Sequence, residues 1–234
     1  MIYTLRTFLV DRANVRRFVE LSEGSIWPAL EQRDGRALGL WNVVMGGAER
    51  IVLMTRYDSL AHWQESRGWP ESQQVGTRSE GLSLEGRQAV ADRAAMTRDT
   101  DLVGLQPLSR RMPLDDTPED RPGLYALRTF RVRPRDDAEF ARLSEEVIWP
   151  WFETMGSRHL CLWRGIIAEN PQLYMLSRYH DISHWQLTRG AGPEPSDLLQ
   201  RERWHAARQA LAQRAALTEH TGVRLLRPIS LRRP

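Results

Sequence analysis

Histidine and arginine are the residues most able to carry chemistry in this sequence, and both recur at one fixed offset. His62 and His184 each stand in a His-Trp-Gln tripeptide. Histidine is the side chain best suited to proton transfer near neutral pH. We therefore treat His62 and His184 as acid/base candidates. The alternative is a surface or capping histidine beside a packing tryptophan.

Two arginines occupy equivalent places in strand-like segments. Arg6 and Arg128 both lie within Leu-Arg-Thr-Phe. A buried arginine needs a partner, because uncompensated burial of a charge is costly. Glu23 and Glu145 are candidate partners in a structural ion pair. Alternatively, the planar guanidinium of each arginine holds the carboxylate or enolate of a ligand and stabilises developing negative charge.

Further candidates for substrate binding come from the strands of the same repeat. Arg56 and Arg178 lie at a strand end and allow the same two interpretations, a structural ion pair or ligand binding. The pair Trp41 and Trp163, together with Tyr174, could line a pocket for a flat apolar ligand. The alternative for the tryptophans is packing in the core.

The composition excludes several kinds of chemistry. All 33 basic residues are arginine, so there is no lysine for a Schiff base, pyridoxal phosphate or a P-loop. The single cysteine, Cys161, lies in an apolar run and excludes disulfides and Cys-based metal sites within one chain. The arginines are spread among acids, so no nucleic-acid footprint is expected. We expect no metal and no cofactor; haem held by a histidine is the alternative.

The chain is an internal duplication. Tyr3-Thr4-Leu5-Arg6-Thr7-Phe8 recurs as Tyr125-Ala126-Leu127-Arg128-Thr129-Phe130, and the match continues without a gap through the His-Trp-Gln tripeptides. The sequence therefore predicts a first unit over 1–111 and a second over 124–234. The stretch 112–123 between them is rich in proline and aspartate and is predicted to be an exposed linker.

Each copy shows the same order of predicted elements. In the first copy, strands are expected over 2–10, 36–45, 50–57 and 101–110, and helices over 14–31, 59–67 and 84–98. This order, β-α-β-β-α-α-β, is ferredoxin-like. The expected class is α+β, with two tandem ferredoxin-like units packed sheet to sheet as a pseudo-dimer, with a cavity between the sheets.

The opening Tyr-x-Leu-Arg-Thr-Phe, the Leu-x-Leu-Trp strand and Arg56-Tyr57-Asp58-Ser59-Leu60 resemble the NIPSNAP family. The resemblance covers both copies, most strongly 3–68 and 125–190. It implies the dimeric α/β-barrel fold. It also departs from the family pattern: Thr4 and Ala126 replace the acidic residue usual after the opening tyrosine.

The favoured function is a small-molecule enzyme that acts without metal or nucleotide on an apolar or aromatic substrate. Isomerisation, cyclisation and cofactor-free oxygenation are the expected reaction types. The alternative is a non-catalytic ligand-binding or protein-interaction protein. The sequence has no apolar run long enough to cross a membrane and no signal-peptide pattern. It is therefore expected in the cytoplasm, with a homodimer of the fused pseudo-dimer as a further expectation.

Overall fold

A computed structural model describes residues 1–46, 50–66, 84–111, 122–167 and 172–231. The chain forms two compact units, which are described separately below. The first contains Met1–Val43, Ala48–Gln106 and Ile229–Pro234, and the second contains Val44–Gly47 and Pro107–Pro228. The units follow the two sequence copies, except that Val44–Gly47 belongs to the second unit and Ile229–Pro234 to the first. Residues 112–121 of the predicted linker lie outside the described residues, so its exposure stays a prediction.

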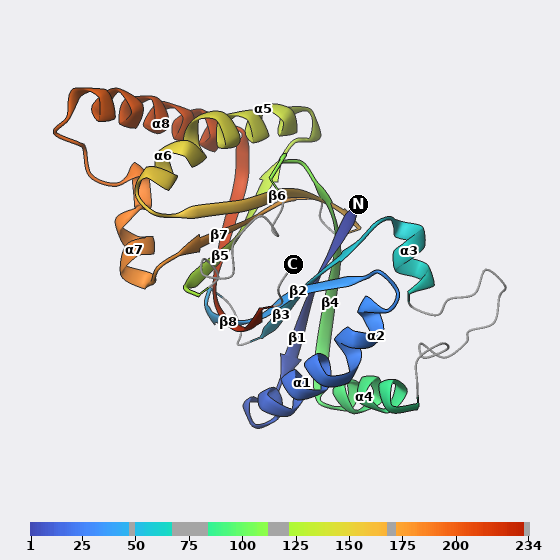
Figure 1. Ribbon diagram of the computed structural model, residues 1–234. Coiled ribbons are helices and arrows are strands. Elements are labelled where there is room, and N and C mark those ends of the chain that lie inside the picture. The colour runs from blue at the N-terminus through green and yellow to red at the C-terminus, as the bar shows by residue number, and fades with distance from the viewer. Residues whose placement is uncertain (47–49, 67–83, 112–121, 168–171, 232–234) are drawn as a thin grey trace. The chain divides into compact units, whose positions relative to one another are not determined.

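The first unit is an antiparallel sheet with helices on one side (Figure 1). Its strands, in the spatial order β4-β1-β3-β2, are β4 (Thr97–Pro107), β1 (Ile2–Val10), β3 (Ile51–Tyr57) and β2 (Arg36–Met45). Its helices are α1 (Val15–Leu21), α2 (Trp27–Glu31), α3 (Leu60–Glu65) and α4 (Leu84–Ala95), with a short 3-10 turn at Arg12–Asn14.

The second unit repeats this plan. Its strands, in the spatial order β8-β5-β7-β6, are β8 (Thr218–Leu231), β5 (Leu124–Val132), β7 (Leu173–Tyr179) and β6 (Arg158–Ile167). Its helices are α5 (Asp137–Arg142), α6 (Trp149–Thr154), α7 (Ile182–Leu187) and α8 (Leu198–Ala216), with 3-10 turns at Pro134–Asp136 and Arg189–Ala191. The predicted fold class, α+β with two ferredoxin-like units, is confirmed.

The first helix of each copy widens before a Trp-Pro pair that both copies contain. A π-helical stretch, Ser22–Ile26, joins α1 to α2, and Leu143–Ile148 joins α5 to α6. Pro28 and Pro150 lack a backbone N–H, and a proline ring clashes with the carbonyl four residues earlier in a regular helix. A wider π turn just before the proline relieves both problems. The following tryptophans, Trp27 and Trp149, are thereby buried under the helix against the sheet.

The core of each unit lies between its sheet and its helices. Strand alternation sends one set of side chains towards the helices. In the first unit Phe8 packs on Phe18, and in the second Phe130 packs on Phe140 at the equivalent place. The same helix-facing side of the sheet therefore provides both the core and, as shown below, the walls of a cavity.

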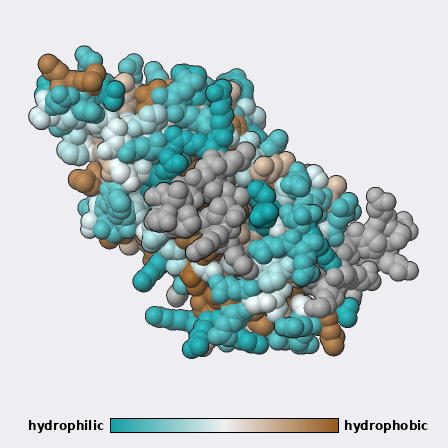
Figure 2. Space-filling model, in the orientation of Figure 1, coloured by the Kyte–Doolittle hydropathy of each residue, from teal (hydrophilic) through white to brown (hydrophobic). Residues whose placement is uncertain are grey.

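The visible surface is mostly hydrophilic. Figure 2 shows a small hydrophobic group at the outer end of α8 (upper left), where Leu198 and Leu199 are exposed. Isolated exposed leucines are ordinary on protein surfaces. We assign no interaction surface to them.

Candidate functional site

Each unit contains a cavity between its sheet and its helices. The first cavity has a volume of about 440 Å³ and lies among β1, β3, α2 and α4. The second has a volume of about 360 Å³ and lies among β5, β7, α6 and α8. The sequence predicted a ligand space between the two sheets; these cavities lie on the helix-facing side of each sheet instead.

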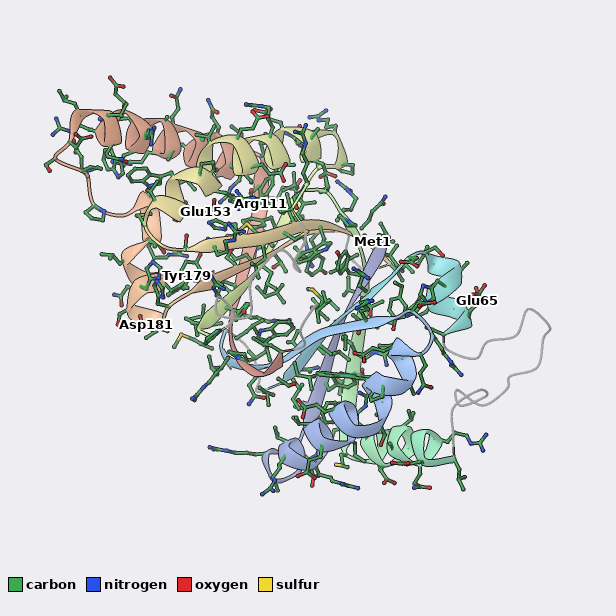
Figure 3. The ribbon with its side chains drawn as sticks, in the orientation of Figure 1. Met1, Glu65, Arg111, Glu153, Tyr179 and Asp181 are labelled. Carbon is green, nitrogen blue, oxygen red and sulfur yellow. The ribbon has the colours of Figure 1, made fainter. Side chains whose placement is uncertain are left out.

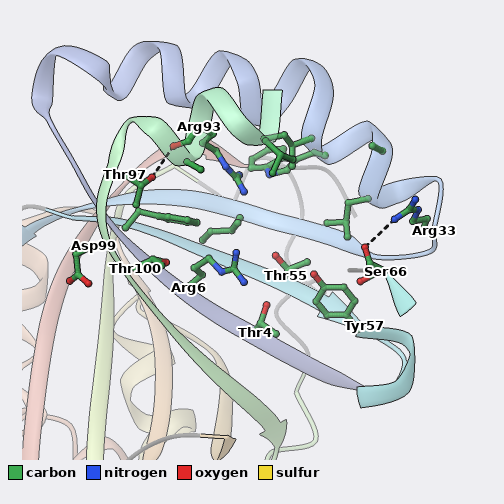
Figure 4. A pocket seen from close by; sticks show the side chains of 18 of the residues that line it. Thr4, Arg6, Arg33, Thr55, Tyr57, Ser66, Arg93, Thr97, Asp99 and Thr100 are labelled. Carbon is green, nitrogen blue, oxygen red and sulfur yellow. Dashed lines mark hydrogen bonds between the residues drawn. The ribbon is translucent and has the colours of Figure 1, made fainter. Parts of the chain in front are cut away.

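Strand alternation selects the side chains that reach the first cavity. Thr4, Arg6 and Phe8 come from alternate positions of β1, and Thr55 and Tyr57 from alternate positions of β3. Figure 4 shows the guanidinium groups of Arg6 (from the sheet) and Arg93 (from α4) both pointing into this space.

The two cavities share a framework that the duplication preserves. The equivalent pairs are Arg6 and Arg128, Phe8 and Phe130, Thr55 and Ser177, Tyr57 and Tyr179, Arg93 and Arg214, and Thr97 and Thr218. Of these, Ser177 contacts His159 at the second cavity, and the other members line the two cavities. Each cavity thus combines two arginines and a tyrosine with aromatic walls.

Arg214 is held deep in the second unit by neutral groups. It is 7% exposed, donates to Ser144 Oγ at 3.0 Å, and lies over the rings of Phe130 and Phe140. Burial, together with the nearby charge of Arg128, lowers the pKa of Arg214 to about 9. The group still carries its charge at neutral pH, so its burial costs free energy that no ion pair among the described residues offsets.

Arg128 is the second cation of this cavity. Its Nε is buried without a hydrogen-bond partner among the described residues. Burial lowers the pKa of Arg128, and the charge of Arg189 acts in the same direction. Glu145, expected as its ion-pair partner, instead accepts a hydrogen bond from the backbone N–H of Arg110 at 2.8 Å. Among the described lining residues the one carboxylate is Glu219, which is exposed.

A hydrogen-bonded chain of neutral groups completes the second cavity. His159 on β6 lies 2.8 Å through Nδ1 from Ser177 Oγ on β7, and Ser177 also bonds the phenol of Tyr179. Burial raises the pKa of Tyr179. Burial also lowers the pKa of His159 well below its usual range, and the charges of Arg214, Arg111 and Arg128 add to this. Both rings are therefore neutral near pH 7.

Arg111, which follows β4 in the chain, braces the second cavity from outside. It pairs with Glu153 through both guanidinium nitrogens, donates to the backbone carbonyl of His159 at 3.1 Å and lies over the ring of Trp149 (Figure 3). Trp149 in turn stacks on His159, with the ring planes 7° apart. The position of the His159 ring is thus fixed from two sides.

The histidines chosen from the sequence lie elsewhere. His62 accepts a hydrogen bond at Nδ1 from the backbone N–H of Asp58, and its Nε2–H donates to the carbonyl of Arg33. His184 makes the same pair of contacts, with the N–H of His180 and the carbonyl of Met155. Neither lines a cavity. Because both nitrogens of each ring are engaged with backbone, this geometry favours the alternative of a structural role.

His184→Ala should lower the free energy of unfolding by about 1–3 kcal/mol, because it leaves the Met155 carbonyl and the His180 N–H without their partner. Urea denaturation measures the change, with the exposed His205→Ala on α8 as the matched control. An unfolding midpoint equal to that of the control would show that the two backbone contacts contribute nothing.

The residues expected to bind substrate lie on the opposite face of each sheet. Register places Trp41 opposite Val52, Trp163 opposite Tyr174, Arg56 opposite Tyr3 and Arg178 opposite Tyr125. Directly opposed residues share a face, and this face alternates with that of Arg6 and Arg128. None of Trp41, Trp163, Tyr174, Arg56 or Arg178 lines either cavity. A ligand role for them stays a prediction.

Three residues of the candidate site were not predicted as site residues from the sequence. Arg214, His159 and Tyr179 meet Arg128 in the second unit although they come from α8, β6 and β7. The duplication held a usable signal for two of them, because Arg93 and Tyr57 recur as Arg214 and Tyr179. His159 carried no such signal, since Ala37 stands at the equivalent place.

The described residues contain no group of three or more metal-binding side chains of the His, Cys, Asp and Glu types. Cys161 is a buried free thiol, as expected. In the part of the chain that the structure describes, no helix is long and apolar enough to cross a membrane. The cytoplasmic location and the homodimer stay predictions.

Comparison with known proteins supports the fold and the family resemblance. The NIPSNAP family model matches residues 3–81, which confirms the resemblance over the first copy. No curated protein matches the sequence.

Three solved structures share the fold over nearly the whole chain. An anthrone oxidase-like protein matches with a TM-score of 0.58 and 12% identity, over 99% of this chain and 92% of that one. A protein provisionally assigned as a monooxygenase from Fusobacterium nucleatum matches with a TM-score of 0.56 and 13% identity, over 99% of this chain and 94% of that one. Another with the same provisional assignment, from Lactobacillus acidophilus, matches with a TM-score of 0.54 and 10% identity, over 99% of each chain. The chain therefore has the fold of dimeric α/β-barrel proteins.

Proposed function

We propose that this protein is a small-molecule enzyme whose substrate is a compact aromatic or apolar molecule with an acidic O–H, or with an acidic C–H beside a carbonyl. Proton removal from such a molecule leaves a phenolate or an enolate. The reaction class is proton transfer, which serves isomerisation, cyclisation or cofactor-free oxygenation.

One observation carries the proposal. The second cavity places Arg128 and the buried Arg214 in an aromatic enclosure where the described lining offers no buried carboxylate. Two desolvated cations without an anion are unfavourable in the free protein. An anionic ligand would compensate both charges, and charge-assisted hydrogen bonds of this kind are the strong ones.

The shape and lining of the cavity support a ligand of this size and polarity. Its volume of about 360 Å³ lies in the range of ligand pockets, which are mostly apolar with a few placed polar groups. Phe130, Phe152 and Trp185 provide aromatic walls. The structural neighbours, an anthrone oxidase-like protein and a provisionally assigned monooxygenase, are consistent with an aromatic substrate but do not select one.

Non-catalytic binding is the second candidate function, and one observation favours it for the first cavity. That cavity keeps the two arginines and the tyrosine of the framework but has Ala37 where the second has His159. It can hold an anion without offering a histidine to remove a proton.

The test is binding of a ring-nitrated 2-naphthol at about pH 7.5, at which it is ionised (a 2-naphtholate) while Arg214 keeps its charge. The comparison compound is the equally nitrated 2-methylnaphthalene, which has nearly the same size but no acidic oxygen. We expect the naphtholate to bind at least about tenfold more tightly, which corresponds to about 1.4 kcal/mol. Isothermal titration calorimetry gives both affinities. Equal affinities, or failure of both molecules to bind, would overturn the proposal.

A further inference from the structure

His159 offers the second cavity a polar atom that the fold itself does not use. The ring is 4% exposed and lines the cavity, and its Nε2 has no hydrogen-bond partner among the described residues. A buried polar atom left without a partner costs free energy. A ligand that supplies the missing partner would recover that cost.

The hydrogen-bonded chain accommodates a proton on Nδ1 of His159. Ser177 Oγ carries one hydrogen and bonds both the Tyr179 phenol and Nδ1 of His159. In the tautomer proposed below, that hydrogen is donated to the phenolic oxygen. The serine oxygen is then the acceptor for Nδ1–H of His159, 2.8 Å away. This leaves Nε2 with a free lone pair that faces the cavity, which is the state of a base.

We propose that Nε2 of His159 is the proton acceptor of the second cavity, and that the first cavity binds the same class of ligand without removing a proton. This inference rests on the proposed function. In the step, Nε2 takes the proton from the O–H or C–H of the ligand, and the electron pair of that bond stays on the ligand as a phenolate or enolate. Return of the proton to another carbon completes an isomerisation with no further reactant.

The surrounding charges link removal of the proton to stabilisation of the ligand anion. The titratable and charged groups that face or brace His159 come from five elements: Arg111, Arg128, Glu153, Tyr179 and Arg214. Three of these are cations, and Glu153 is already paired with Arg111. The imidazolium is therefore unfavourable in the empty cavity. It becomes favourable once the ligand anion lies between it and the arginines, so proton transfer and anion stabilisation occur together.

The ring is held in place for this task. Trp149 stacks on one face of the imidazole and Phe152 meets it edge to face. Arg111 fixes the backbone carbonyl of His159 at 3.1 Å. In the first unit the equivalent position is Ala37, which is buried in the core and offers no group to take the proton. The carboxylate Asp99 in the lining of the first cavity is paired with Arg50.

The experiment uses the ketone 2-tetralone in deuterated buffer, with NMR to follow deuterium entering the carbon between the carbonyl and the aromatic ring. Exchange reports proton removal whatever reaction follows. We expect His159→Gln to slow protein-catalysed exchange by about 100-fold or more, while its affinity for 2-naphtholate stays within about threefold. The exposed His205→Gln is the matched control and should exchange at the wild-type rate.

The outcomes separate this inference from the proposed function. Tight naphtholate binding with exchange equal in the wild type and His159→Gln overturns the inference alone. Loss of naphtholate selectivity in the wild type overturns the proposed function as well.

A second measurement needs neither a ligand nor a variant's activity. Nitrogen-15 shifts of the wild-type histidines should show His159 with the proton on Nδ1 at neutral pH. A proton on Nε2 would overturn the inference.

Discussion

Arg128→Met should weaken binding of 2-naphtholate to the second cavity by about 10- to 100-fold, because a charge-assisted hydrogen bond in a desolvated site contributes about 1.5–3 kcal/mol. The same substitution should leave the free energy of unfolding unchanged or raise it. Arg128 has a buried Nε with no partner among the described residues, and an apolar side chain of similar length removes that cost. A functional cation is expected to show this opposition between binding and stability.

The binding measurement is made in an Arg6→Met background, so that the first cavity does not contribute. Arg131→Met is the matched control, since Arg131 lies on the same strand but is exposed. Guanidinium chloride denaturation of the same variants gives the stability. If Arg128→Met lost several kcal/mol of stability and bound naphtholate as before, Arg128 would be a structural residue and the anion site would be wrong.

The free energy of unfolding should fall by about 1.4 kcal/mol for each pH unit below about pH 6.5 on account of His159 alone. Its pKa in the folded protein is held well below the usual value by burial and by the neighbouring arginines. Below the unfolded pKa the unfolded chain therefore binds a proton that the native protein does not. Stability from this residue is present above pH 6.5 and is lost as the pH falls, until the folded pKa is reached.

His159→Gln isolates the contribution, because glutamine has no titration in this range. Urea denaturation at a series of pH values between about 7 and 5 should give a steeper loss for the wild type than for His159→Gln, and the slopes should differ by one proton. His205→Gln, at an exposed position, is the matched control for replacing a histidine by glutamine. Identical slopes for all three proteins would show that His159 takes up a proton in the folded state as easily as in the unfolded state.

The two cavities differ in ways that bear on both predictions. Arg6, Tyr57 and Arg93 recur in the second copy as Arg128, Tyr179 and Arg214, so the proposed anion-binding framework is common to both copies. His159 does not recur. Five of the six histidines lie in the second copy, His159 among them, and with Tyr174 they predicted a functional pocket richer in polar groups from that copy. The position that the structure favours for that difference is His159 against Ala37.

The sequence by itself determined the duplication, the element order and the fold class. These depend on local signals, namely strand alternation, helical spacing and the recurrence of whole motifs, and such signals survive without knowledge of the packing. It also selected Arg6 and Arg128, because an arginine in the middle of an apolar strand must find a partner or a ligand.

Only the tertiary structure decided where the site lies. A strand pattern gives two faces but does not say which one the helices cover, so Trp41, Trp163, Tyr174, Arg56 and Arg178 were chosen from the face that neither cavity uses. The packing of α8 over the sheet brings Arg214 to Arg128, and the pairing of β6 with β7 brings His159 to Ser177. His62 and His184 have the right chemistry, but the backbone occupies both nitrogens of each ring: Nδ1 accepts from an N–H four residues earlier, and Nε2 bonds a carbonyl distant in sequence. Folding alone buries the His159 ring, leaves its Nε2 without a partner among the described residues and brings two guanidinium groups together. No local sequence pattern encodes these properties.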